Sequence, residues 1–177
     1  MRWVALIRGI NVGASRKLPM AELREECVKL GWADVATYIQ SGNLVFSAPG
    51  TARELETRLE QAISEHFGLD VPVIVRKGFD WARYTQTPFP EAACAEPNRL
   101  MLMLSKKPPA ADAASAIQER ARDGERVALA GDAVWIHYPA GSGTSRLSPS
   151  LLDRLIGSPA TSRNCRTILK LAEMAAE

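Results

Sequence analysis

Cysteine and histidine are scarce in this chain of 177 residues. It has three cysteines and two histidines, and no two cysteines have the C-x-x-C spacing. Zinc sites usually draw ligand pairs from positions a few residues apart, and a disulfide framework needs an even set of cysteines. The sequence therefore predicts no metal site and indicates no cofactor. Each cysteine is expected to be a small buried residue in a reducing compartment.

Long apolar runs are also missing. The longest, residues 3–7 and 100–104, fall far short of the roughly 20 residues that cross a bilayer. The apolar start closes at Arg8, too early for a signal peptide. With 46% hydrophobic and 24% charged residues, the composition is that of a globular protein. We expect a soluble cytoplasmic protein that makes no use of a membrane.

Standard catalytic signatures are absent as well. There is no G-x-S-x-G, Walker A, H-E-x-x-H or EF-hand pattern. Gly141-Ser142-Gly143 begins like a G-x-G-x-x-G motif, but the position of its last glycine is occupied by Arg146. Whether the protein is an enzyme is left open. An enzyme acting on an anionic substrate would use Arg8, Arg146 or Arg163 to stabilise negative charge. Its proton-transfer group would be sought among Asp70, Tyr38 and His137.

Hydrophobic periodicity predicts the order βαββαβ twice. Strands are expected at residues 2–8, 35–40, 44–47 and 71–75, with helices at 19–31 and 51–67. The pattern returns with strands at 100–104, 127–129, 134–138 and 158–162 and helices at 111–121 and 148–156, before a terminal helix. This predicts an α+β protein of two split-βαβ lobes, with antiparallel sheets and helices on one face. The lobes are placed at residues 1–77 and 99–177, joined by a connecting helix and loop at 78–98.

The charges are unevenly distributed, although the net charge is only +2. Residues 1–21 hold Arg2, Arg8, Arg16 and Lys17 with no acid, and residues 138–172 hold five basic residues against Asp153 alone. Each segment forms either a solvated face or part of a surface that attracts anions.

The split-βαβ topology gathers three loops at one edge of the first sheet: the exit of strand 1, the start of helix 1 and the turn between strands 2 and 3. The candidate ligand-binding residues there are Arg8, Gly9, Asn11, Gly13, Lys17, Gln40, Ser41 and Asn43. Glycines let backbone approach a ligand, the cations attract phosphate or carboxylate, and an uncapped helix start offers free N–H groups. The alternative is that the glycines only make turns and Asn43 only tolerates a left-handed conformation.

A second candidate cluster comes from the other lobe and contains Arg146, Arg163 and Asn164. If residues 158–162 form a strand, Arg163 and Asn164 lie at the start of the terminal helix, near the loop that carries Arg146. The alternative is that Ser162 or Asn164 caps this helix.

Residues 4–13, 19–23 and 37–46 together resemble a bacterial family of unknown function, numbered 1697. Residues 138–139, 145–147 and 161–164 extend the resemblance over nearly the whole chain. The resemblance implies two ferredoxin-like lobes and no particular activity. The family often has Ser-Lys-Leu at residues 145–147 and Arg-Asn-Trp-Asn at 163–166, where this chain has Ser-Arg-Leu and Arg-Asn-Cys-Arg.

Three functions remain open. The chain binds an anionic partner (a phosphorylated small molecule, nucleotide or nucleic acid) at the loop after strand 1, or it is an enzyme, or it is a protein-interaction or dimerisation module. The oligomeric state does not follow from the sequence.

Overall fold

The computed structural model describes residues 1–176, which form two compact units. The first unit comprises Met1–Trp81 with the C-terminal residues from Leu171 onward, and the second comprises Ala82–Lys170. The lobe boundaries expected from the sequence, at residues 77 and 98, stay a prediction. Within residues 1–176, no helix has both the length and the apolar character needed to cross a membrane.

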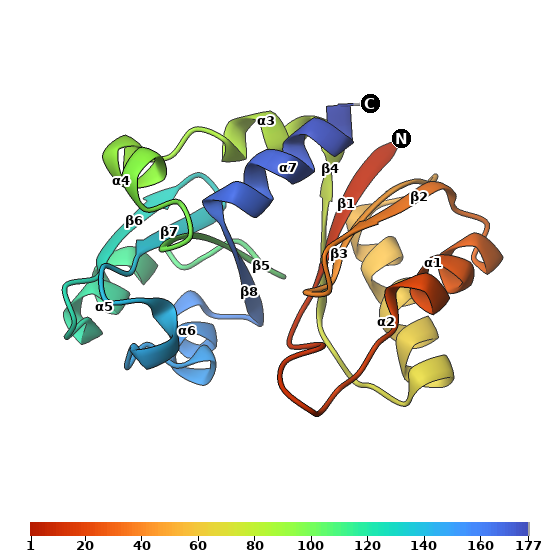
Figure 1. Ribbon diagram of the computed structural model, residues 1–177, viewed down its shortest axis with the longest axis horizontal. Helices are drawn as coiled ribbons and strands as arrows, with labels where there is room; N and C mark the ends of the chain where they lie inside the picture. The colour runs from red at the N-terminus through yellow and green to blue at the C-terminus, as the bar shows by residue number, and fades with distance from the viewer. Residues whose placement is uncertain (177) are drawn as a thin grey trace. The chain divides into compact units, whose positions relative to one another are not determined.

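The first unit is a four-stranded antiparallel sheet with the strand order β2-β3-β1-β4 (Figure 1). Its elements are β1 (Arg2–Ile7), α1 (Met20–Lys29), β2 (Ala33–Tyr38), β3 (Asn43–Ser47), α2 (Ala52–Phe67) and β4 (Val73–Lys77). Helix α1 connects β1 to β2, and β3 lies between these two strands in the sheet, which is the split-βαβ arrangement. A short 3-10 turn, Gly78–Asp80, leads into α3 (Trp81–Tyr84).

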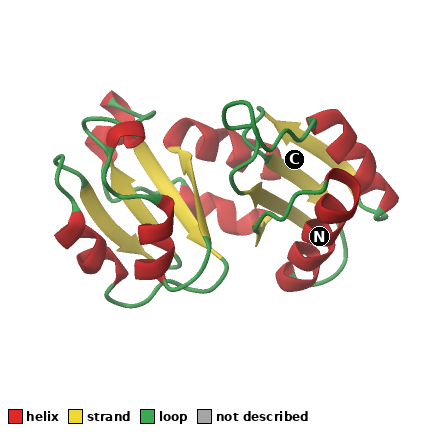
Figure 2. Cartoon of the chain, turned by 90° about the horizontal axis from the view of Figure 1, so that it is seen from below, coloured by secondary structure: helices red, strands yellow, loops and turns green. Residues whose placement is uncertain are grey.

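The second unit repeats this topology with the strand order β6-β7-β5-β8. Its elements are α4 (Pro90–Ala95), β5 (Leu100–Ser105), α5 (Ala113–Arg120), β6 (Arg126–Ala130), β7 (Ala133–His137), α6 (Pro149–Ile156) and β8 (Ala160–Asn164). The last helix, α7 (Cys165–Ala176), follows β8 directly. Helices pack against each sheet, as Figure 2 shows, and the predicted fold class of two ferredoxin-like α+β lobes is confirmed.

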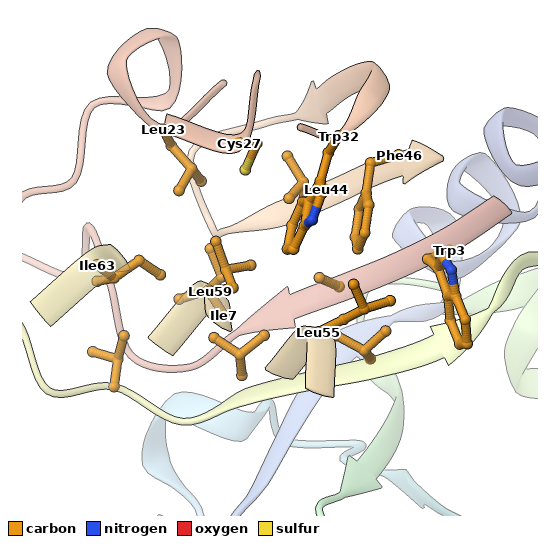
Figure 3. Close-up of a cluster of buried hydrophobic side chains, with 14 of the residues drawn as sticks. Trp3, Ile7, Leu23, Cys27, Trp32, Leu44, Phe46, Leu55, Leu59 and Ile63 are labelled. Carbon is orange, nitrogen blue, oxygen red and sulfur yellow. The ribbon is translucent and has the colours of Figure 1, made fainter. Parts of the chain in front are cut away.

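The core of the first unit lies between its sheet and the helices α1 and α2 (Figure 3). Alternate residues of β1 and β3 point into it, and they meet a stripe of α2 at helical spacing. Trp32 stacks on Phe46 with ring centroids 4.1 Å apart. These buried side chains are Trp3, Ala5, Ile7, Leu44, Phe46, Leu55, Leu59 and Ile63. The capping box predicted at Thr51 and Glu54 is present, and Gly68 ends α2 in the left-handed conformation.

Three local expectations are wrong. The last strand is Ala160–Asn164, two residues later than expected, because Ala160 and Ser162 pair with Ser105 and Met103 of β5. The Pro- and Ala-rich connection, expected to be a loop, contains helix α4, which has proline at its first position. Finally, Cys94 in that helix is exposed, whereas Cys27 and Cys165 are buried as expected.

Candidate functional site

Asn11, in the loop between β1 and α1, joins three segments of the first unit. Its Nδ2 donates hydrogen bonds to the carbonyls of Leu18 (2.9 Å) and Gln40 (2.8 Å), and its Oδ1 accepts the N–H of Leu18 (2.8 Å). Its backbone N–H donates to the carbonyl of Arg16 at 3.0 Å, which closes the loop. One amide side chain thus ties this loop to the β2–β3 turn and to the approach of α1.

Replacing Asn11 by alanine removes three side-chain hydrogen bonds, and we expect the first unit to lose about 2–3 kcal/mol of unfolding free energy. Urea unfolding measures this loss. Hydrogen exchange at the Leu18 amide reports the local effect, and its rate should rise well above that of the wild type. Asn11→Asp separates the contributions, because it tolerates the left-handed backbone and keeps the acceptor for the Leu18 amide but lacks the NH2 group that donates to Leu18 and Gln40. Unchanged exchange at Leu18 in N11A would contradict the proposed bridge.

The β2–β3 turn approaches the end of β1 so closely that one position there requires glycine. The carbonyl of Gly42 accepts the N–H of Ile7 at 2.8 Å. A Cβ on Gly42 would lie 3.0 Å from the Ile7 carbonyl oxygen and 2.8 Å from Cδ1 of Ile10. Asn43 is buried beside it, and its Nδ2 donates to the carbonyl of Tyr38 (2.9 Å) and to Oγ of Ser41 (3.0 Å). The buried side chain of Asn43 therefore stabilises the conformation of the turn.

Helix α1 begins at this same edge without a side-chain cap. Its N-cap is Pro19, the residue that the sequence suggested as the first helical position, so the helix begins one residue later, at Met20. Pro19 makes no side-chain capping hydrogen bond. The N–H groups of the first helical residues have no partner within the helix, and they carry the positive end of its dipole. Glu22 in the first turn offsets part of this field. The opening of α1 remains suited to a further acceptor.

Two exposed cations stand on the loop before α1, namely Arg16 and Lys17. The Arg16 guanidinium folds back over Gly9, since a Cβ there would lie 3.5 Å from its Nη1. Arg8 is half-buried at the base of the loop, and its backbone N–H donates to the carbonyl of Pro72 at 3.0 Å. The same α2–β4 connection carries Asp70, whose carboxylate accepts a hydrogen bond from Ser64.

Left-handed backbone is concentrated in these loops. Four residues other than glycine have positive φ within residues 1–176, and three of them are Asn11 (54°), Arg16 (54°) and Ile39 (49°). For a β-branched residue such as Ile39 this conformation is a true outlier. Such conformations cost about 1–3 kcal/mol each and gather at binding and catalytic sites. Ile39 was not predicted to contribute to the site, and Arg16 was expected at this edge only as a cation of the acid-free segment. Composition alone gives no sign of their backbone angles.

In the second unit, Arg163 and Asn164 both have internal partners. Arg163 is 7% exposed, and its Nη1 donates to Oγ1 of Thr161 (2.8 Å) and to the carbonyl of Ser162 (2.7 Å). Burial lowers the pKa of Arg163 to about 10. The Oδ1 of Asn164 accepts the N–H of Thr167 at 2.9 Å and so caps α7, which is the alternative considered from the sequence.

Arg146 is exposed on a loop that a buried carboxylate holds in place. Glu125 accepts hydrogen bonds from Oγ of Ser145 (2.5 Å) and from the N–H groups of Arg122 (3.1 Å) and Asp123 (2.8 Å). Burial by itself raises the pKa of Glu125, but these hydrogen bonds outweigh it and keep the pKa below its ordinary value. No sequence pattern indicates this role of Glu125, because the role depends on Ser145, 20 residues away.

The candidates for proton transfer are divided between the two units. His137 is buried in the second unit between Oε2 of Glu96 (2.9 Å from Nε2) and Nη2 of Arg126 (3.3 Å from Nδ1). Both ring nitrogens therefore have protein partners. Tyr38 and Asp70 belong to the first unit. Of the predicted residues, the structure brings together those of the first cluster, from Arg8 to Lys17 and from Gln40 to Asn43.

The repeated strand order and the glycine-rich edge define a two-lobed protein built from two ferredoxin-like units. Within that class, residues 1–135 match the family described as "Protein of unknown function (DUF1697)", and the chain belongs to this family. The match confirms the resemblance noted in the sequence; the segments at residues 138–164 lie beyond it.

A solved structure, the conserved bacterial protein SP0830 from Streptococcus pneumoniae, is similar over 98% of both chains. The two share 25% sequence identity with a TM-score of 0.76. No curated protein matches this chain.

Proposed function

We propose that this protein binds an anionic ligand, namely a phosphorylated small molecule, a nucleotide or a nucleic acid, at the edge formed by the loop after β1. The observation that carries the proposal is the Asn11 bridge. It joins a loop with two exposed cations to the β2–β3 turn and to the uncapped start of α1. Segments 1–21 and 35–52, which supply most of this edge, contain no acidic side chain.

The residues of this edge divide into two groups. Arg16 and Lys17 supply charge, with Arg8 at the base of the loop, while Gly9 and Gly13 let a ligand approach the exposed backbone. Asn11 and Asn43 act by fixing the loops, since their side-chain amides bond to protein groups. The exposed side chains of Gln40 and Ser41 line the turn and offer neutral hydrogen bonds.

The proposal makes no use of Arg163 and Asn164, because their polar groups serve their own strand and helix. Arg146 is exposed in the second unit, and its contact with an anion stays a prediction.

Binding of inorganic phosphate, ATP and a fluorescein-labelled oligonucleotide at low salt tests the proposal. Thermal shift serves for the first two probes and fluorescence anisotropy for the third. We expect at least one probe to bind the wild type. The R16A/K17A variant should bind that probe with an affinity lower by roughly 10-fold or more, because two charge-assisted contacts are lost.

The matched control is K107A/R120A, which removes the same charge from exposed positions of the second unit. It should change the affinity less than twofold. Equal weakening by both double variants would show that only net charge matters. Failure of all three probes to bind would refute the proposed function.

A further inference from the structure

Two apolar side chains are exposed on the loops that carry the cations. Val12 is 70% exposed and Ile39 is 50% exposed. Each is next in sequence to one member of the pair that the Asn11–Gln40 hydrogen bond joins, so the bridge presents both on the same pair of loops. We name Val12, Ile39, Arg16 and Lys17 the mixed patch.

Single exposed apolar residues are common on protein surfaces and need no explanation. The mixed patch differs because its two aliphatic side chains are 27 positions apart in the sequence, and the Asn11–Gln40 hydrogen bond joins the two loops that carry them. Ile39 also has a left-handed backbone conformation that favours asparagine or glycine, and it is still half exposed there. A ligand that covers the patch would bury both side chains, which folding alone leaves in water.

We propose that the mixed patch binds single-stranded nucleic acid, with phosphates at Arg16 and Lys17 and bases packed against Val12 and Ile39; this rests on the proposed function. The charge fits, because segment 1–21 holds cations and no acid, and segment 35–52 holds no charged side chain of either sign. A single strand also exposes the faces of its bases, and proteins pack unstacked bases against aromatic or apolar side chains.

Other anionic ligands match the patch less well. Inorganic phosphate has no apolar face to cover Val12 and Ile39. A duplex hides its base faces within the stack and offers mainly its phosphates. A stable protein interface buries about 800 Å² on each partner and draws on roughly 20–30 residues a side, whereas the mixed patch has four members. A single-stranded nucleic acid that follows the two loops contacts both the cationic and the aliphatic side chains of the mixed patch, and it needs only a small contact area to do so.

The test is fluorescence anisotropy with a labelled 12-nucleotide oligo-dT on the full chain, at several salt concentrations. V12S/I39N should weaken binding roughly 10-fold through lost base contacts, with the salt dependence unchanged. R16A/K17A should weaken it too, and should reduce the slope of log K against log salt by about 1.4, or 0.7 for each lost phosphate contact. V28S is the matched control, because Val28 is a 61% exposed valine on α1 outside the mixed patch.

The outcomes separate the two proposals. If phosphate or ATP binds the wild type but oligo-dT does not, the nucleic-acid inference is wrong and the proposed function stands. The inference is also overturned if V12S/I39N binds oligo-dT like the wild type, if the corresponding duplex binds as tightly, or if an acidic peptide binds instead. Unfolding does not confuse the result, since asparagine suits the left-handed backbone at position 39 and the Tm of I39N should equal or exceed that of the wild type.

Discussion

Replacing Gly42 by alanine will destabilise the first unit by about 3–4 kcal/mol, through backbone strain and steric overlap together. The φ of Gly42 is 84°, so any Cβ is unfavourable there. The new methyl group would also lie 3.0 Å from both the Cβ and the carbonyl oxygen of Ile7, and these atoms belong to the central strand β1. The end of Ile10 can rotate away, but the backbone of β1 cannot move without breaking the Gly42–Ile7 hydrogen bond.

Gly13→Ala separates the two contributions to this loss. Gly13 has a φ of 66° on the same edge of the unit, but a Cβ there meets no atom within 4 Å. Its replacement should cost about 1 kcal/mol, the conformational part alone. Urea unfolding followed by tryptophan fluorescence measures both variants. Equal losses in G42A and G13A would show that the close approach to Ile7 contributes nothing.

The fold was predictable because its signals are local. The apolar stripe of α2, its Thr51–Glu54 capping box and Gly68 at its end all lie within one stretch of chain, and the helix forms where they indicate. The continuous burial of β1 and β3 likewise follows from short apolar runs in the sequence. The edge where the loops meet was also predictable, since a split-βαβ topology leaves few alternatives.

The roles of individual side chains were less predictable, because they depend on partners distant in sequence. Asn11 was expected to face a ligand, and its amide instead reaches Gln40 across the sheet edge. Arg163 was expected at an open helix start, yet the two-residue shift of β8 places it within the strand, where it is buried. Residue type suggested an anion site at both positions, whereas burial and hydrogen bonding are fixed by tertiary structure.

Replacing Glu125 by glutamine will destabilise the second unit at neutral pH by about 2–4 kcal/mol. The carboxylate is 3% exposed and accepts hydrogen bonds at both oxygens. A glutamine of the same shape keeps one acceptor and points an NH2 group at donors, so buried N–H or O–H groups lose their partner. Because Ser145 is among these donors, the loop that carries Arg146 should become more mobile as well.

The pH dependence identifies the carboxylate as the cause. The pKa of Glu125 is lower in the folded protein than its ordinary value of 4.5, so the folded state favours the ionised form. Its contribution is therefore fully present above the unfolded-state pKa and is lost as the pH falls through the folded-state value. The difference in unfolding free energy between wild type and E125Q should be constant from pH 7 to about 5 and should shrink below about pH 4.

Urea unfolding of both proteins at pH 7, 5, 4 and 3.5 measures this difference. Other carboxylates with lowered pKa values, such as Glu96 and Glu54, are present in both proteins and cancel in the comparison. Glu119→Gln is the control, because Glu119 is an exposed glutamate of the same unit, and its difference from the wild type should stay within 0.5 kcal/mol, the range typical of exposed substitutions. If the E125Q difference did not change with pH, packing rather than the charge of Glu125 would hold the Ser145 loop, and the exposed position of Arg146 would not depend on this carboxylate.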